Sequence, residues 1–276
     1  MRIARFTSGG DPAYGFVQTE GDQDYLAVVQ GDPLFMKSMP TGVRIPLSSE
    51  GDDDAAEVTD YDEDSPPVRL LAPVIPRSKV VCVGLNYVEH IKEMGHNMPA
   101  APVLFMKPNT AVCGPDDPII LPPWADEVSY EVELAVVIGK ACRNIQPKDA
   151  HNFIVGYTVA NDVTARDAQR TDGQWTRAKG ADTFCPLGPW IVTDFDPSNA
   201  RITSRVNGVT KQDSNLADML FDVPFLVSYI SEMMTLLPGD VILTGTPAGV
   251  GPIHDGDIVE CEIEGIGTLR NPVIRR

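Results

Sequence analysis

The sequence predicts a β-rich α+β fold in which a small N-terminal β domain precedes a larger domain. The 24 prolines and 23 glycines among 276 residues indicate many turns. Most apolar runs are short and bounded by such turns, as β-strands are. Only residues 215–237 carry a long apolar pattern at helical spacing. We place the domain boundary near residues 65–75, which divides the chain into residues 1–70 and 71–276.

The composition narrows the class of protein. A net charge of −17 argues against binding to nucleic acid or to an anionic membrane, although local cations and a metal still permit a small anionic substrate. The N-terminus lacks the apolar segment of a signal peptide, and no apolar run approaches a membrane span. The five scattered cysteines form no CxxC pair and no closed disulfide set. We therefore expect a cytoplasmic protein with free thiols.

The first 48 residues predict a small β unit with strands at residues 2–6, 14–18 and 25–29, separated by turn sequences. Residues 50–64 follow, with nine carboxylates and no cation. Such a run is typical of a solvated loop or linker.

The larger domain is predicted to contain strands at residues 79–84, 102–108, 119–121, 130–139, 153–160 and 202–207. Short helices are expected at residues 88–94 and 164–170, and a loop at residues 171–190. Residues 215–237 predict one long helix, interrupted at Pro224. The apolar residues expected to face the core from this helix are Phe225, Leu226, Tyr229, Ile230, Met233 and Met234. The C-terminal residues predict a β-meander.

Two carboxylates stand at the front of the predicted strand at residues 130–139. Glu131 and Glu133 are two residues apart, so both side chains project from the same face of the strand. Two bare anions beside a buried strand repel each other and lose hydration. Either one of them is protonated, or they face solvent, or a cation lies between them. The spacing alone leaves a solvated sheet face and a metal site equally open.

A second series of glutamates shows why spacing does not decide. Glu260, Glu262 and Glu264 alternate with apolar residues, as on a water-facing sheet surface. The strand beyond Glu133, by contrast, is apolar on both faces, and Asp162 ends another apolar strand. Three carboxylates at strand ends supply oxygen ligands suited to Mg²⁺, Mn²⁺ or Ca²⁺ rather than Zn²⁺. Taken alone, three carboxylates would leave a bound divalent ion with a net charge near −1.

Three further groups could take part in catalysis. His90 and Glu93 are three residues apart on a predicted helix, where a carboxylate can orient a histidine as a general base. The same spacing also fits a surface pair. Arg166 and Gln169 form a second group, but Arg166 could equally belong to a structural salt bridge. Lys179 lies in a glycine-bounded loop that leaves room for a substrate but also fits an exposed lysine. The chain lacks the GxSxG, Walker A, GxGxxG and HExxH motifs.

Several of these motifs occur together in an order that resembles the fumarylacetoacetate hydrolase family. The matching segments run from about residue 70 to residue 276. They are residues 83–87 (VGLNY) with His90 and Glu93, 105–108 (FMKP), 131–134 (EVEL), 161–167 (NDVTARD), 179–189 (KGADTFCPLGP), 237–240 (LPGD) and 244–247 (TGTP).

The resemblance implies a mixed β-sandwich roll, usually in a homodimer. It implies Mg²⁺ or Mn²⁺ held by Glu131, Glu133 and Asp162, with Ca²⁺ as a further possible hard cation. It also implies a mobile segment, residues 87–102, that brings in a dyad of His90 and Glu93. The remaining functional positions implied are Lys179 as an active-site lysine and Asn86, Tyr87, Lys107, Arg166, Gln169 and Thr246 as substrate-binding residues.

The activity implied is metal-dependent hydrolysis of a C–C bond in an acylpyruvate-type 1,3-diketo acid, such as fumarylpyruvate. The products would be pyruvate and a carboxylic acid, as in the catabolism of aromatic compounds. In this hypothesis His90, oriented by Glu93, activates water, and Lys179 stabilises the oxyanion. Oxaloacetate decarboxylation and isomerisation of a hydroxymuconate-type diacid would use the same metal site and are the alternative reactions. A metal-dependent binding protein without catalytic activity is the alternative from another class.

Overall fold

The computed structural model describes residues 1–47, 67–93, 95 and 97–276; the acidic run at residues 50–64 lies outside the described residues. The chain begins with four antiparallel strands in the order β4-β3-β2-β1. Their bounds are Arg2–Thr7 (β1), Ala13–Glu20 (β2), Gln23–Gln30 (β3) and Met39–Leu47 (β4). The three strands predicted here are confirmed. They enclose a small core of Ala4, Phe6, Val17, Leu26 and Ile45.

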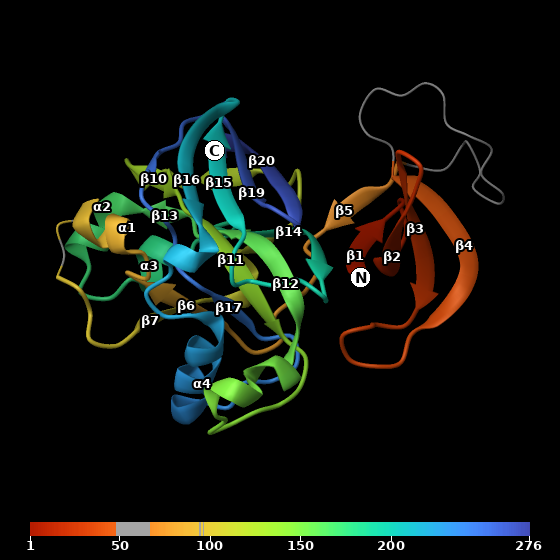
Figure 1. Cartoon of the computed structure of the whole chain (residues 1–276). Helices are drawn as coiled ribbons and strands as arrows, with labels where there is room; N and C mark the ends of the chain where they lie inside the picture. Colours follow the sequence, from red (N-terminus) through yellow and green to blue (C-terminus); the bar gives the residue numbers. More distant parts are fainter. Residues whose placement is uncertain (48–66, 94, 96) are drawn as a thin grey trace.

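The N-terminal strands continue into the main sheet. β1 pairs with β14 (Cys185–Val192) and also with β5 (Arg69–Leu71). The resulting sheet has 12 strands, and its main order beyond β1 is β14-β12-β11-β17-β6-β7. In Figure 1 the N-terminal strands form a lobe beside the body that holds the other strands. The remaining strands of this order are β6 (Val80–Gly84), β7 (Val103–Lys107), β11 (Val132–Ile138), β12 (Ile154–Asn161) and β17 (Val241–Leu243). In addition, β8 (Val112–Cys113) pairs with β14.

The strand β11 lies in the interior of this sheet, and all seven of its residues are buried. β11 pairs antiparallel with β12 on one side and with β17 on the other. A strand covered on both faces needs apolar residues at successive positions, which explains the unbroken apolar run that predicted it.

A second sheet packs over β11, β12 and β14. Its order is β16-β15-β19-β20-β9. Apolar side chains of both sheets, including Val136, Val159, Cys261 and Leu269, belong to one core cluster. The two packed sheets confirm the β-rich sandwich expected from the sequence. The strands concerned are β9 (Ile119–Leu121), β15 (Arg201–Val206), β16 (Val209–Asn215), β19 (Ile258–Ile263) and β20 (Gly267–Arg275).

A third, small sheet has the order β13-β10-β18, and several short helices connect the strands. These strands are β10 (Val128–Tyr130), β13 (Thr164–Ala165) and β18 (Gly251–Pro252). The helices are α1 (Val88–Glu93), α2 (Arg166–Thr171), α3 (Thr176–Lys179), α4 (Val223–Met233) and the 3₁₀ helices η1 (Asn109–Ala111), η2 (Pro147–Asn152) and η3 (Leu216–Asp218). Figure 1 shows α1, α2 and α3 at the end of the body that lies away from the N-terminal lobe.

The prediction of one long helix at residues 215–237 is wrong. β16 runs to Asn215, η3 follows, and α4 begins only at Val223. Pro224 lies in the first turn of α4, where its missing N–H costs no hydrogen bond, so it starts the helix rather than interrupting it. The Asp222 side chain caps this end by accepting a hydrogen bond from the Phe225 N–H at 2.9 Å.

The predicted core face of this helix is also partly wrong. Val223, Leu226, Val227 and Ile230 are buried. Phe225 and Met233, in contrast, are 39% and 56% exposed. Apolar residues occur on more than one side of α4, so the spacing alone did not identify the side that packs on the body.

The loop predicted at residues 171–190 contains two regular elements instead, α3 and β14. Pro186, Gly188 and Pro189 indicated a loop, yet they lie within β14. The pairing of β14 with β12 shifts register between Tyr157 and Val159, so the ladder there is interrupted. An interrupted ladder tolerates residues that cannot donate a hydrogen bond.

All five cysteines are buried and free, as expected. The alternation in β19 is confirmed, with Val259, Cys261 and Ile263 buried. Within the described part of the chain, no helix has both the length and the apolar character needed to cross a membrane.

The burial pattern of α4 leads to a stability prediction. Leu226→Ala should lower the free energy of unfolding by about 2–5 kcal/mol, because it removes a fully buried side chain and leaves a cavity. Met233→Ala on the same helix should change it by no more than about 0.5 kcal/mol. Chemical denaturation of both variants measures the difference, and equal losses would contradict the placement of the two faces.

Candidate metal centre and active site

Two neighbouring strand ends bring three carboxylates together. Glu131 lies between β10 and β11, Glu133 lies in β11, and Asp162 directly follows β12. The Asp162 N–H donates to the Glu131 carbonyl at 2.8 Å, and the Glu131 N–H donates to the Asn161 side-chain oxygen at 2.9 Å. One carboxylate oxygen from each of the three residues lies within 4.8 Å of the others, and all three residues are buried. The predicted cluster of three carboxylates is therefore present.

Three buried cations surround this cluster. The Lys179 ammonium lies 2.8 Å from Glu131 Oε2 and 2.6 Å from Asp162 Oδ2. The Arg166 guanidinium lies 2.6 Å from Glu131 Oε1, and the Lys107 ammonium lies 2.7 Å from Asp162 Oδ1. Three cations balance three carboxylates, so a divalent ion would bring the centre to a net charge near +2. The charge near −1 that the carboxylates alone would give does not include these three cations.

The cations act unequally on the three carboxyl groups. Burial raises the pKa of Glu131, but the charges of Lys179 and Arg166 outweigh it and hold that pKa well below its usual value. Burial also raises the pKa of Glu133, and the charges of Asp162 and Glu131 raise it further, to well above its usual value. The charge of Lys179 and the Gly245 N–H, which lies 2.6 Å from Glu133 Oε2, only partly offset this. Of the two glutamates, Glu133 is therefore the one that needs an additional positive charge nearby in order to stay ionised.

Lys179 itself remains a cation. Burial lowers its pKa, but the neighbouring Asp162 and Glu131 carboxylates more than compensate, so the net shift is upward. Lys179 is the last residue of the short helix α3 and is only 3% exposed. The prediction that Lys179 lies in an open loop is therefore wrong. A buried ammonium held by two carboxylates is suited to fixing charge rather than to removing protons.

The donor set fits a hard divalent cation. Carboxylate oxygens are the ligands that Mg²⁺ and Mn²⁺ prefer, and the raised pKa of Glu133 reflects a charge that such a cation would compensate. Glu131, Glu133 and Asp162 would hold the ion.

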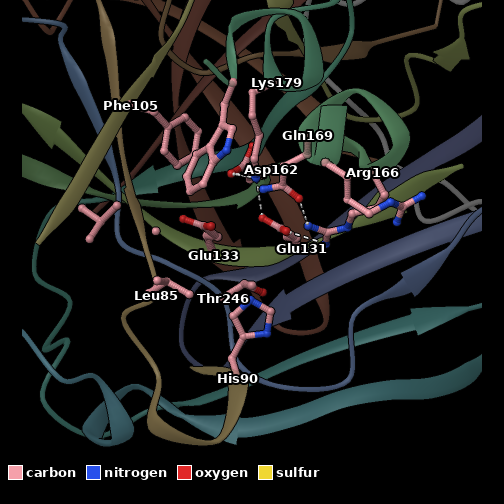
Figure 2. Close-up of a pocket in the computed structure, with 14 residues that line it drawn as sticks. Leu85, His90, Phe105, Glu131, Glu133, Asp162, Arg166, Gln169, Lys179 and Thr246 are labelled. Carbon is pink, nitrogen blue, oxygen red and sulfur yellow. Dashed lines mark hydrogen bonds and ion pairs between the residues drawn. The ribbon is translucent and has the colours of Figure 1, made fainter. Parts of the chain in front are cut away.

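The histidine dyad faces the same centre from α1. His90 Nδ1 lies 3.0 Å from Glu93 Oε2, and His90 is buried. Glu93 also accepts a hydrogen bond from the Gly249 N–H, which lies 3.1 Å and 3.3 Å from its two oxygens. The contact with Glu93 occupies Nδ1, and no hydrogen bond to Nε2 occurs among the described residues. In Figure 2 the three carboxylates lie between Lys179 and His90.

These groups line one cavity of about 230 Å³. Its wall includes most of the predicted site residues: His90, Glu131, Glu133, Asp162, Arg166, Gln169, Lys179 and Thr246. Six further residues line the wall and were not predicted as site residues: Val83, Gly84, Leu85 and Phe105, which lie in the matching segments, and Arg170 and Trp175. Phe105 and Trp175 meet edge to face, with ring centroids 5.2 Å apart, and give one side of the cavity an aromatic surface.

Three predicted substrate-binding residues are not part of the cavity wall. The Lys107 ammonium donates to the carbonyl oxygens of Val163, Lys179 and Phe184 at 3.0, 2.6 and 2.7 Å. These three hydrogen bonds and the ion pair with Asp162 engage the whole ammonium group, which lies behind the carboxylates as seen from the cavity. Lys107 therefore supports the centre from behind.

Asn86 and Tyr87, the other two, form the junction between β6 and α1. The Asn86 amide donates to the carbonyl oxygens of Phe221 and Thr244 at 3.0 and 2.7 Å, and its oxygen accepts from the Phe221 N–H at 2.8 Å. Tyr87 is 1% exposed and forms a β-bridge with Met219. Both residues anchor the start of α1 to the body of the protein.

One important residue carried no signal in the sequence. Gln212, fully buried in β16, accepts hydrogen bonds from the Val132 N–H at 3.1 Å and the Ser204 hydroxyl at 2.9 Å. Its amide donates to Thr246 Oγ1 at 2.8 Å and to the Pro247 carbonyl at 2.7 Å. It therefore joins the peptide between Glu131 and Glu133 to the segment that contains Thr246. Nothing in the polar sequence around it distinguishes it from a surface glutamine.

Two protein-family models match most of the chain. The model of the fumarylacetoacetate hydrolase C-terminal domain matches residues 79–274, and the Rv2993c-like N-terminal model matches residues 1–49. Protein Rv2993c of Mycobacterium tuberculosis is 60% identical over 212 residues, which cover 76% of this chain and 80% of that protein.

Two relatives with named activities are similar over most of the chain. The mitochondrial oxaloacetate tautomerase Fahd2a of Rattus norvegicus is 47% identical over 75% of this chain and 70% of its own length. The crystal structure of 5-carboxymethyl-2-hydroxymuconate delta-isomerase from Mycobacterium smegmatis is 48% identical, with a TM-score of 0.87 and complete coverage of both chains. Because the family model matches residues 79–274, which are more than half of the chain, the chain belongs to the fumarylacetoacetate hydrolase family.

Proposed function

We propose that this protein is a Mg²⁺- or Mn²⁺-dependent enzyme that transfers protons on dianionic α-keto acids, with keto–enol tautomerisation of oxaloacetate as its main reaction. The observation that carries the proposal is the charge of the centre. With a divalent ion the three carboxylates and the three buried cations sum to about +2, which matches a substrate with two negative charges. The 47% identical oxaloacetate tautomerase supports the choice of substrate.

The protein's own groups suit a proton transfer. When bound, a divalent cation supplies positive charge that stabilises an enolate. His90 Nε2 removes a proton from C3 of the keto form and delivers it to the enolate oxygen at C2, which gives the enol, so atoms and charge balance. Glu93, 3.0 Å from Nδ1, orients the ring and stabilises its protonated form. Lys179 and Arg166 keep Glu131 ionised throughout, and the buried position of His90 limits exchange of the proton with water.

A second candidate is the acylpyruvate hydrolysis expected from the sequence. The aromatic side of the cavity, formed by Phe105 and Trp175, favours a substrate with a longer apolar or unsaturated tail than oxaloacetate has. In that reaction His90 would take its proton from water instead of from carbon. The name of the 48% identical isomerase contains a hydroxymuconate-type diacid, and such diacids also have an unsaturated tail.

The candidate reactions can be separated with one set of assays. With Mg²⁺ or Mn²⁺, we expect loss of the enol absorbance of oxaloacetate to be faster than pyruvate release. A chelator should abolish this activity and added Mn²⁺ should restore it. Fumarylpyruvate and a hydroxymuconate-type diacid are tested at the same concentrations. A higher kcat/KM for cleavage of fumarylpyruvate would replace tautomerisation by hydrolysis as the function.

The role of His90 gives a second prediction. His90→Ala should lower kcat by roughly 10²–10⁴-fold, the usual contribution of a positioned general base. The affinity for Mn²⁺ should not change, because His90 is not among the three ligands. His151→Ala, in the exposed part of η2, is the matched control. Unchanged turnover in His90→Ala, with the control also active, would show that the dyad does not transfer the proton.

A further inference from the structure

Glu93 contacts the protein backbone as well as His90. Its two oxygens lie 3.1 Å and 3.3 Å from the Gly249 nitrogen, and Oε2 lies 3.0 Å from His90 Nδ1. Gly249 belongs to the segment between Thr246, which lines the cavity, and β18. Since the N–H is part of the backbone, the position of Glu93 depends on the position of this segment.

Gly249 itself is fixed from two directions. Its φ angle is +98°, and a Cβ atom there would lie 2.2 Å from the Lys211 carbonyl oxygen, so the segment lies directly against β16. On the other side, the Tyr130 hydroxyl donates to the Gly249 carbonyl at 2.8 Å. Tyr130 is 2% exposed and pairs with Gly251 between β10 and β18. The Tyr130 ring therefore cannot leave Gly249 without disturbing this sheet.

Tyr130 is also the residue before Glu131. A short path of covalent and hydrogen bonds thus leads from the carboxylate centre to the dyad, through Tyr130, Gly249 and Glu93 to His90. The carbonyl and the N–H used in this path belong to the same residue, Gly249, and are joined through its Cα, so the bond that holds the carbonyl restricts where the N–H can lie.

We propose that Tyr130 is a positioning residue for the dyad. By holding the Gly249 carbonyl, it restricts the N–H that donates to Glu93, and so helps to place His90 relative to the carboxylates. This inference rests on the proposed function only for the proton transfer by His90, and it does not depend on which keto acid reacts. Tyr130 itself is not in the cavity wall and touches no reacting atom.

The test uses Tyr130→Phe in the metal-loaded protein, since this change removes one hydroxyl and keeps the ring. We expect kcat to fall roughly tenfold, which corresponds to the loss of one net hydrogen bond. KM and the Mn²⁺ affinity should stay within about twofold. Tyr157→Phe is the matched control, because Tyr157 is similarly buried but packs on Phe195, outside the cavity wall.

A second background separates positioning from a general structural effect. In a Glu93→Gln protein, Tyr130→Phe should reduce kcat by less than about twofold further, because the group that it positions is already impaired. An equal tenfold loss in both backgrounds, or no loss in the otherwise unchanged protein, would overturn the proposal.

A readout without turnover keeps the test independent of the substrate. Amide hydrogen exchange in residues 88–93 and 246–251 should be faster in Tyr130→Phe than in the unchanged protein or in Tyr157→Phe, since the contact between α1 and Gly249 is weakened. Unchanged exchange in both segments would overturn the role of Tyr130. If none of the keto acids reacts, the proposed function fails, while this measurement still decides on Tyr130.

Discussion

Three buried carboxylates on neighbouring strand ends are the constraint on which this structure depends. Glu131, Glu133 and Asp162 would repel each other strongly in a medium from which water is excluded. Lys107, Lys179 and Arg166 balance the charge through contacts of 2.6–2.8 Å to Glu131 and Asp162. Glu133 instead receives a backbone N–H from Gly245. The remaining need for positive charge at Glu133 is what makes the centre suited to a divalent ion.

The surrounding fold holds these charges at fixed distances. β11 is buried on both faces, and its register with β12 sets Glu131 beside Asp162. Gln212 ties the peptide between the two glutamates to the segment that lines the cavity at Thr246. The same segment presents Gly249 to the dyad. The carboxylate centre and the dyad proposed to transfer protons are therefore joined through the backbone of one loop.

Much of this could be predicted from the sequence because burial leaves a periodic pattern. The apolar run after Glu133 predicted a buried strand, and alternation in Glu260, Glu262 and Glu264 predicted a solvent-facing surface, where Glu260 and Glu262 pair with Arg205. Long-range contacts leave no such pattern. Neither the role of Gln212 nor the position of Lys107 behind the carboxylates follows from neighbouring residues. The core face of α4 was predicted incorrectly because apolar residues occupy both its buried side and the side that carries Phe225 and Met233.

The central claim is that the three carboxylates bind a divalent cation, and Glu133→Gln tests it most directly. This change keeps the shape of the side chain and removes its charge. Titration with Mn²⁺, followed by electron paramagnetic resonance, should find one site in the unchanged protein and an affinity at least about tenfold lower in Glu133→Gln. Glu260→Gln, a strand glutamate on the outer surface, should bind as the unchanged protein does. Equal Mn²⁺ affinity in all three proteins would contradict the account.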